Sequence, residues 1–172
     1  MTGRGLRRAK RETEDVTGVS PFHVPAGEGK AFWGPGDRYT FLTTGADTNG
    51  GCFILEAFVP PGGGPPPHIH HREDEFFYLL SGRLSVTIAG SVIAARAGDF
   101  VRIPRGVAHC FHNDGSEEAR LLAIFTPAGM EGWFEECLDP APDKTTPPPP
   151  ATPEMIARMI AAGPKHGVEW AK

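Results

Sequence analysis

The sequence predicts an all-β domain of the jelly-roll kind, a sandwich or barrel of short strands, with one or two helices near the C-terminus. Glycine and proline are both abundant, with 22 and 18 residues among 172, and the apolar runs between them are short. These runs follow one another at regular spacing without intervening helical patterns, as is typical of all-β sandwiches and barrels. A helical period appears only after residue 129.

The barrel is predicted to span residues 21–128. Residues 1–20 are basic and then acidic, and we expect a flexible, solvated N-terminal arm there or, alternatively, an arm that crosses onto a partner subunit. The proline-rich residues 60–67 cannot continue a hydrogen-bonded ladder, because proline lacks the N–H donor, and we expect a stiff loop that delivers His68. Runs of strand character lie at residues 22–24, 30–33, 38–43, 52–59, 83–88, 92–94, 99–103, 108–111 and 119–125.

Two helices are predicted after the barrel. Residues 129–139 carry apolar side chains at the spacing of an amphipathic helix, and we expect their aromatic face to pack on the barrel. Residues 140–172 begin as a proline-rich linker and continue as a C-terminal helix and tail. Thr152 and Pro153 are suited to the N-cap and the first helical position, and Gly163 ends the pattern. The two apolar stripes comprise Met130, Trp133, Phe134, Cys137 and Leu138, and Met155, Ile156, Met159 and Ile160.

The composition argues against several classes of partner. A formal net charge of −4 gives no reason to expect binding to nucleic acid or to an anionic membrane surface. No apolar run reaches the roughly 18 residues that a membrane span needs. The three cysteines lack zinc-type spacing and no signal peptide precedes them, so we expect a cytoplasmic location.

Histidines and acids cluster between residues 65 and 82. Successive side chains of a strand point to opposite faces, so His68 and His70 share one face. Glu75 follows after a short loop. Two imidazoles and a carboxylate brought together in this way are three quarters of a divalent metal site. Further along the chain, His109 enters a strand just past a Pro-Arg-Gly turn.

Two motifs make the chain resemble a single-domain cupin, a small metal-binding β-barrel. The family motifs are G-x5-H-x-H-x3,4-E-x6-G and G-x5-P-x-G-x2-H-x3-N, and every fixed position of both is filled. By this resemblance the fold is the cupin jelly-roll barrel, and the metal ligands are His68, His70, Glu75 and His109. The motif residues are Gly62, His68, His70, Glu75 and Gly82 in the first motif, and Gly98, Pro104, Gly106, His109 and Asn113 in the second.

This set of ligands suits one divalent transition metal ion. Three neutral imidazoles and a carboxylate bind Fe, Mn, Ni, Co, Cu or Zn, and they leave coordination positions open for substrate or O2. The alternative for the three histidines is a set of hydrogen-bonded core residues that bind no metal. Sequence alone favours no one ion over the others, because geometry and cellular availability decide as much as ligand type does.

The sequence also predicts where the residues next to the ligands lie. Strand alternation turns His71 away from His70 and places His112 on the face opposite His109, so neither is expected to be a ligand. Residues 72–74 are expected to form a solvated turn. The side chains that share a face with a ligand could line a pocket or simply pack in the core, and these are Phe77, Leu79 and Phe111.

The overall pattern is similar to the quercetin dioxygenase-like cupins. That resemblance implies a dioxygenase that acts on a flavonol-like, enolic or electron-rich aromatic small molecule, with Glu75 as both metal ligand and proton acceptor. A non-redox metal enzyme (an isomerase, decarboxylase or polyketide cyclase) is the alternative, and a barrel that binds a small molecule without catalysis is another. The resemblance also implies a homodimer, with the N-terminal strands as the contact.

Overall fold

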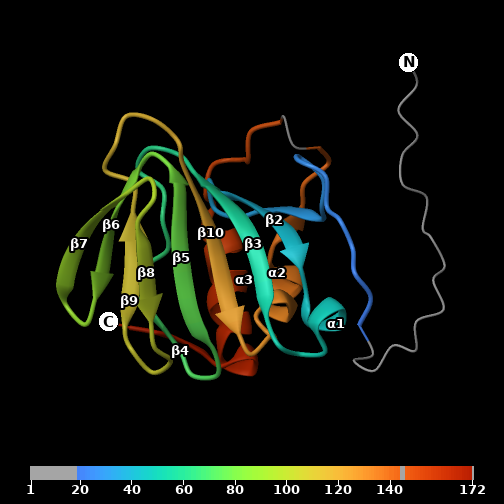
Figure 1. The fold of residues 1–172 in the computed structure, drawn as a ribbon. Coiled ribbons are helices and arrows are strands. Elements are labelled where there is room, and N and C mark those ends of the chain that lie inside the picture. The colour runs from blue at the N-terminus through green and yellow to red at the C-terminus, as the bar shows by residue number, and fades with distance from the viewer. Residues whose placement is uncertain (1–18, 144–145, 172) are drawn as a thin grey trace, which may run out of the picture.

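Two antiparallel β-sheets face each other in the computed structural model, which describes residues 19–143 and 146–171 (Figure 1). The predicted all-β jelly-roll fold is confirmed, with short helices at its C-terminal end. The larger sheet has the strand order β11 (Asp139–Pro140), β1 (Ala31–Trp33), β2 (Arg38–Thr43), β3 (Phe53–Val59), β10 (Ala119–Thr126), β5 (Asp74–Ser81) and β8 (Phe100–Ile103). The smaller sheet has the order β12 (Val168–Trp170), β4 (His68–His70), β9 (His109–His112), β6 (Arg83–Ile88) and β7 (Ser91–Arg96).

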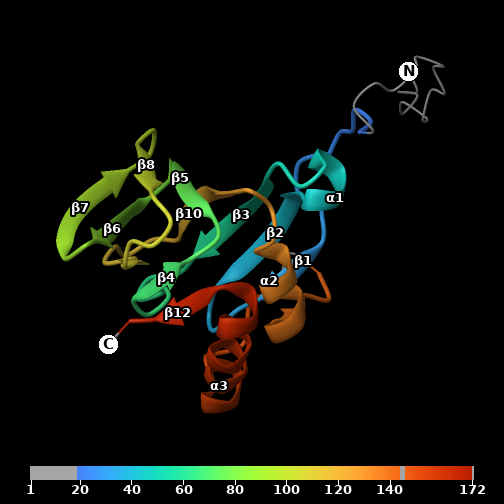
Figure 2. The same ribbon diagram turned by 90° about the horizontal axis from the view of Figure 1, so that it is seen from below.

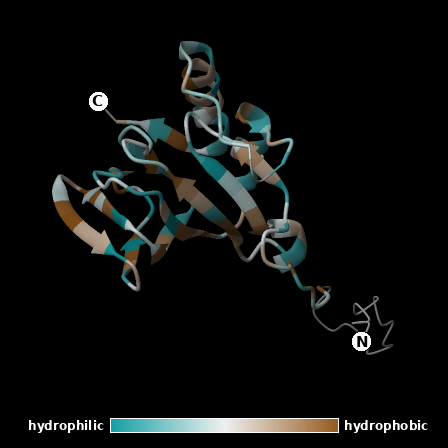
Figure 3. Ribbon diagram, turned by 90° about the horizontal axis from the view of Figure 1, so that it is seen from above, coloured by the Kyte–Doolittle hydropathy of each residue, from teal (hydrophilic) through white to brown (hydrophobic). Residues whose placement is uncertain are grey.

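The core lies between the two sheets. Alternate residues of β3 are buried, as the period of a strand with one face on a core requires. Figure 3 shows hydrophobic residues along the strands and largely hydrophilic loops between them. At the turn from β5 to β6, Gly82 has φ +75°, and a Cβ there would lie 2.8 Å from the Cα of Ala119. Glycine is therefore required at this corner by both conformation and space.

Helices α2 (Glu131–Cys137) and α3 (Pro153–Ala162) pack against each other, while α1 (Gly45–Thr48) is a single turn. The aromatic face of α2 is buried, and the Trp133 indole N–H donates to the Met159 carbonyl at 3.2 Å. Thr152 is the N-cap of α3, and its hydroxyl accepts from the Met155 N–H at 3.2 Å. A 3₁₀ turn, η1 (Gly163–His166), follows α3 directly.

Several segments differ from the sequence-based expectation. The run at residues 22–24 is not a strand, and Phe22 is exposed rather than packed on a sheet. Between the expected runs at residues 38–43 and 52–59 the chain forms the single helical turn α1. The tail after Gly163, for which no structure was predicted, forms η1 and then β12, which pairs with β4. The predicted N-terminal arm lies almost wholly outside the described residues.

Of the helices in the described ranges, none is both long enough and apolar enough to cross a membrane.

Candidate metal centre

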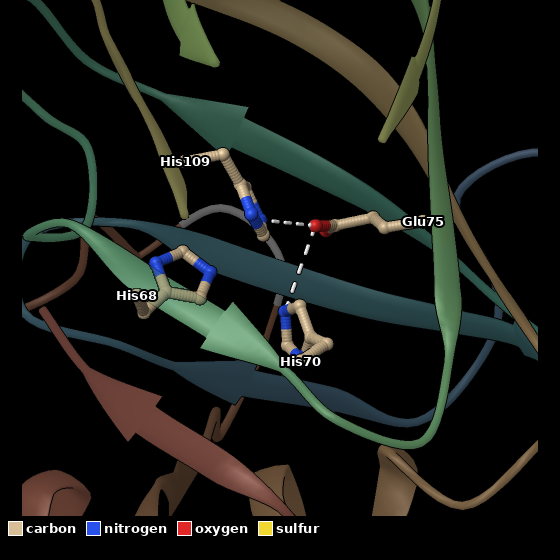
Figure 4. Close-up of side chains that lie close together, drawn as sticks. All are labelled: His68, His70, Glu75 and His109. Carbon is tan, nitrogen blue, oxygen red and sulfur yellow. Dashed lines mark hydrogen bonds and ion pairs between the residues drawn. The ribbon is translucent and has the colours of Figure 1, made fainter. Parts of the chain in front are cut away.

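The four side chains predicted as ligands lie together between the sheets. His68 and His70 come from β4, His109 from the neighbouring strand β9, and Glu75 from β5 of the opposite sheet (Figure 4). His68 and His109 are direct cross-strand partners. One ligand atom from each of the four side chains lies within 4.8 Å of all the others, and all four residues are buried. This convergence is tight enough for one metal ion to contact all four.

Backbone carbonyls hold two of the rings. His68 Nδ1 lies 2.9 Å from the Pro66 carbonyl oxygen, and His109 Nδ1 lies 2.9 Å from the Val107 carbonyl oxygen. A carbonyl only accepts a hydrogen bond, so Nδ1 carries the proton in both rings. Each Nε2 is then the atom that faces the other ligands, as a metal-binding histidine requires.

The carboxylate of Glu75 lies between the imidazoles of His109 and His70. Its Oε2 lies 2.7 Å from His109 Nε2 and 3.5 Å from His70 Nε2 (Figure 4). Burial by itself would lower the pKa of His109, but the hydrogen bond and charge of Glu75, with the Val107 carbonyl, outweigh it and raise the pKa. The His109 nitrogen and the Glu75 carboxylate thus face each other across a place that a cation can take. The chemistry of the donor set fits a divalent metal.

The other two histidines are held neutral. Burial lowers the pKa of His68 to about 3, and the neighbouring His109 adds to this effect. Burial likewise lowers the pKa of His70 to about 2, with further contributions from the surrounding histidines. Neutral imidazole is the form that binds metal, so neither ring needs to lose a proton at neutral pH. His70 Nδ1 is buried and has no hydrogen-bond partner among the described residues.

Three of the four candidate ligands, His68, His70 and Glu75, border a small cavity of about 60 Å³. Apart from His68, His70 and Glu75, its lining within the described residues is apolar or aromatic and includes no lysine or arginine. Tyr39 contributes a hydroxyl, which donates to Asp37 at 3.1 Å. Phe77 and Phe111 line the cavity, whereas Leu79 is buried in the core. The metal centre therefore opens onto a space with few groups that can bind water.

One expectation about the neighbouring residues is wrong. Glu73 was expected in a solvated turn, but it is only 2% exposed, and burial raises the pKa of its carboxyl to about 7. The loop after β10 covers it, since a Cβ on Gly129 would lie 3.1 Å from Glu73 Oε1. The sequence near Glu73 could not have indicated its burial, because the loop that covers it is more than fifty residues away. His71 and His112 are exposed and lie outside the site, as predicted.

Sequence reasoning missed much of the cavity wall. Trp133 and Phe134 from α2 line the cavity, and the aromatic stripe of that helix could have indicated this. Met159 from α3 and Val168 and Trp170 from β12 line it as well. Nothing in the sequence predicts the part played by Val168 and Trp170. A strand of three residues has too short a pattern to recognise, and its partner β4 is about a hundred residues away.

Comparison with known proteins agrees with this structure. Residues 55–125 match the family model described as the Cupin domain, and this segment contains all four candidate ligands. An uncharacterized protein of Streptomyces coelicolor is 39% identical over 50 residues, which cover 29% of this chain. The matched segment spans 47% of that relative, so the chain covers only about half of its length.

Solved structures share the fold at low sequence identity. A Thermotoga maritima protein described as a "predicted oxalate decarboxylase" has a TM-score of 0.57 and 22% identity, over 62% of this chain and 99% of its own. KdgF from a Halomonas species has a TM-score of 0.56 and 17% identity, over 63% and 94%. An RmlC-like cupin from Shewanella frigidimarina has a TM-score of 0.55 and 22% identity, over 65% and 96%.

Residues 55–125 are therefore similar to a cupin domain, and the two-sheet fold and the grouping of three histidines with one glutamate agree with that similarity. At sequence identities this low, the solved structures support the fold of this chain but not a shared reaction.

Proposed function

We propose that the protein is a metal-dependent cupin enzyme, a dioxygenase that acts on a small enolic or electron-rich aromatic molecule. The observation that carries this proposal is the convergence of three imidazoles and one carboxylate within 4.8 Å beside an apolar cavity. His68, His70, Glu75 and His109 would hold one divalent transition metal ion. When bound, such an ion supplies Lewis acidity and, if it is redox-active, reactivity toward O2.

The protein's own residues have three tasks in this proposal. The Pro66 and Val107 carbonyls keep two imidazoles in the orientation that presents Nε2. The aromatic lining excludes water, which strengthens every electrostatic interaction inside the cavity. Glu75 Oε2 accepts a hydrogen bond from His109 Nε2 at 2.7 Å, and this carboxylate would serve as the acceptor for the proton of an enol or phenol.

The cavity favours a particular kind of substrate. Its described lining holds no lysine or arginine, so a substrate with several negative charges would find no partner there for the charges that do not reach the metal. Its volume of about 60 Å³ is well below the roughly 300–1,000 Å³ of pockets for drug-sized ligands. The best fit is a neutral molecule that chelates through an enol and is smaller than a flavonol.

The first test is metal content. We expect the wild-type protein to bind one equivalent of Fe, Mn, Ni, Co, Cu or Zn, measured by elemental analysis after purification and reloading. Replacing His109 with alanine should lower metal affinity at least about tenfold, since even changes behind a ligand commonly cost that much. His112→Ala is the matched control, because this histidine lies on the same strand but is exposed. Equal metal content in the two variants would contradict the proposed centre.

The second candidate is a non-redox metal enzyme, such as an isomerase, decarboxylase or cyclase. The small volume of the cavity favours it, because an oxygenase must accommodate O2 beside the substrate. An oxygen electrode separates the two with the metal-loaded protein and a series of β-diketones and phenols. The dioxygenase consumes O2 in proportion to substrate, whereas the second candidate turns over at the same rate under anaerobic conditions. Binding without turnover in either atmosphere indicates a small-molecule-binding barrel.

The homodimer and the cytoplasmic location remain predictions, as does the lack of nucleic-acid and membrane partners. Sedimentation of the purified protein checks the first of these.

A further inference from the structure

The C-terminal cap, which we define as residues 153–170 with α3, η1 and β12, is attached to the strand that carries two ligands. In β12, Val168 pairs with His70 and Trp170 pairs with His68. The backbone contact extends beyond the strand at both ends, with His71 N–H donating to the Gly167 carbonyl at 2.8 Å and Ala171 N–H donating to the Pro67 carbonyl at 2.9 Å. Figure 2 shows β12 alongside β4, with α3 on the same side of the barrel.

Three cap residues form part of the cavity wall. Met159, Val168 and Trp170 line the cavity together with residues of the barrel and of α2. The Trp170 ring lies 5.8 Å from the His68 ring and 6.3 Å from the Trp133 ring, measured between centroids. The cap therefore contacts a candidate ligand directly and encloses the space next to it.

The barrel side of the cavity has little freedom to change its shape. Leu55, Phe77, Leu121 and Phe125 are at most 2% exposed and belong to the continuous core between the sheets. Core side chains at native packing density have no room to move apart. Met159 and Val168 of the cap belong to the same core, but Met159 is an unbranched and adaptable side chain. Replacing it enlarges the cavity without removing any barrel residue.

We infer that the C-terminal cap sets the size of the substrate that can reach the metal centre, with Met159 and Val168 as the size-determining residues. This inference rests on the proposed function, because it concerns the substrate of the same site. It assigns to residues 153–170 a part in specificity that the cupin motifs, at residues 62–113, do not contain.

The test uses two chelating probes with the same enol group. Pentane-2,4-dione is small. In 1,3-diphenylpropane-1,3-dione the same enol group lies between two phenyl rings. The protein is loaded with Co(II), whose visible spectrum changes when a probe binds at the metal. Affinities are compared for the wild type, Met159→Ala and Met155→Ala. Met155 is the matched control, because it lies on the same helix and is also 6% exposed but does not line the cavity.

We expect the wild type and Met155→Ala to bind the small probe and to bind the diphenyl probe much more weakly. Met159→Ala should bind the diphenyl probe at least about tenfold more tightly than the wild type does, with the affinity for the small probe changed less than about threefold. Adding Val168→Ala should increase the gain. The inference is overturned if the wild type binds both probes equally, or if Met155→Ala and Met159→Ala behave alike.

A measurement without metal separates failure of this inference from failure of the proposed function. If Co(II) does not bind, the metal centre is wrong, and the size of the cavity is then measured in the metal-free protein with xenon and benzene. Apolar cavities of suitable size bind both. We expect the wild type to bind xenon only and Met159→Ala to bind benzene as well. If the Met159→Ala variant does not bind benzene, the inference that the C-terminal cap sets the size of the cavity is overturned.

Discussion

Pro66 and Val107 each lie two residues before a histidine that faces the metal centre, and each accepts the Nδ1 proton of that histidine. The same local bond thus orients His68 and His109 on two different strands. His70 has no such bond, since its Nδ1 lacks a partner in the described part of the chain and its Nε2 approaches Glu75. Two of the three imidazoles are therefore oriented by their own backbone, and the third depends on residues brought by the fold.

Asp37 is a buried carboxyl at the turn before β2, and burial raises its pKa to about 7, with the Tyr39 hydroxyl as its hydrogen-bond partner. Its pKa in the unfolded chain is near 3.8. The folded state therefore holds the proton more tightly. The stability from this group is complete below pH 3.8 and is lost as pH rises through 7.

We expect Asp37→Asn to remove this pH dependence. The free energy of unfolding of the variant relative to the wild type should increase between pH 4 and pH 8 by a few kcal/mol, because one pKa unit corresponds to about 1.4 kcal/mol. Urea unfolding of both proteins at a series of pH values measures the difference. Asp74→Asn is the control, because hydrogen bonds from Arg105 lower the pKa of the Asp74 carboxyl. The free energy of unfolding of this variant relative to the wild type should therefore decrease as pH rises. Parallel curves for wild type and Asp37→Asn would contradict the prediction.

At the scale of elements, the loop before β4 is fastened to the end of β9. Gly62 N–H donates to the Asn113 carbonyl at 2.8 Å, and Asn113 N–H donates to the Gly63 carbonyl at 2.9 Å. The buried Asn113 side chain donates to the carbonyls of Val59 and Glu117 and accepts from the Gly115 N–H. The asparagine of the second motif is thus a structural residue that joins the loop of the first motif to the strand of His109.

The closest backbone approach in this loop is at Gly64, which occupies a variable position of the first motif. Its φ is +134°, and a Cβ would lie 2.1 Å from the Phe111 carbonyl oxygen. We expect Gly64→Ala to destabilise the fold by about 3 kcal/mol and to weaken metal binding, because the loop that delivers His68 must move. Thermal unfolding and metal titration measure the two effects.

Gly62→Ala is the matched control for this prediction. Gly62 has φ +80°, but a Cβ there would have no atom within 4 Å. Only the conformational strain of a left-handed residue remains, about 1 kcal/mol. A larger loss for Gly62→Ala than for Gly64→Ala would show that steric contact with β9 is not what matters in this loop.

At the scale of the whole molecule, the chain closes on itself where its last strand pairs with β4. We expect a chain that ends at Gly163 to unfold at a lower temperature and to bind metal at least about tenfold more weakly, since it exposes the edge of the strand that carries His68 and His70. Glu169→Ala is the control, because it removes only an exposed ion pair with His71. Wild-type metal affinity in the shortened chain would mean that β4 is held by β9 alone.

Much of the barrel could be predicted from local patterns, and the grouping of the four candidate ligands from the resemblance to the two cupin motifs. Strand alternation puts His68 and His70 on one face, and the motif spacing identifies Glu75 among three neighbouring acids. The structure brings these residues together with His109. The run at residues 22–24 had the same alternation but no sheet to pack on, so pattern alone was not sufficient there.

The sequence by itself therefore determined the fold class and the shared face of His68 and His70, since side-chain direction in a strand depends on the backbone of that strand. Glu75 and His109 were assigned through the resemblance to the cupin motifs. Only the tertiary structure decided the burial of Glu73, the pairing of β12 with β4 and the wall that Met159, Val168 and Trp170 add to the cavity. The physical reason is that these features come from contacts between segments far apart in the chain. Their free energy depends on packing in three dimensions, for which a single strand or loop carries no periodic signal.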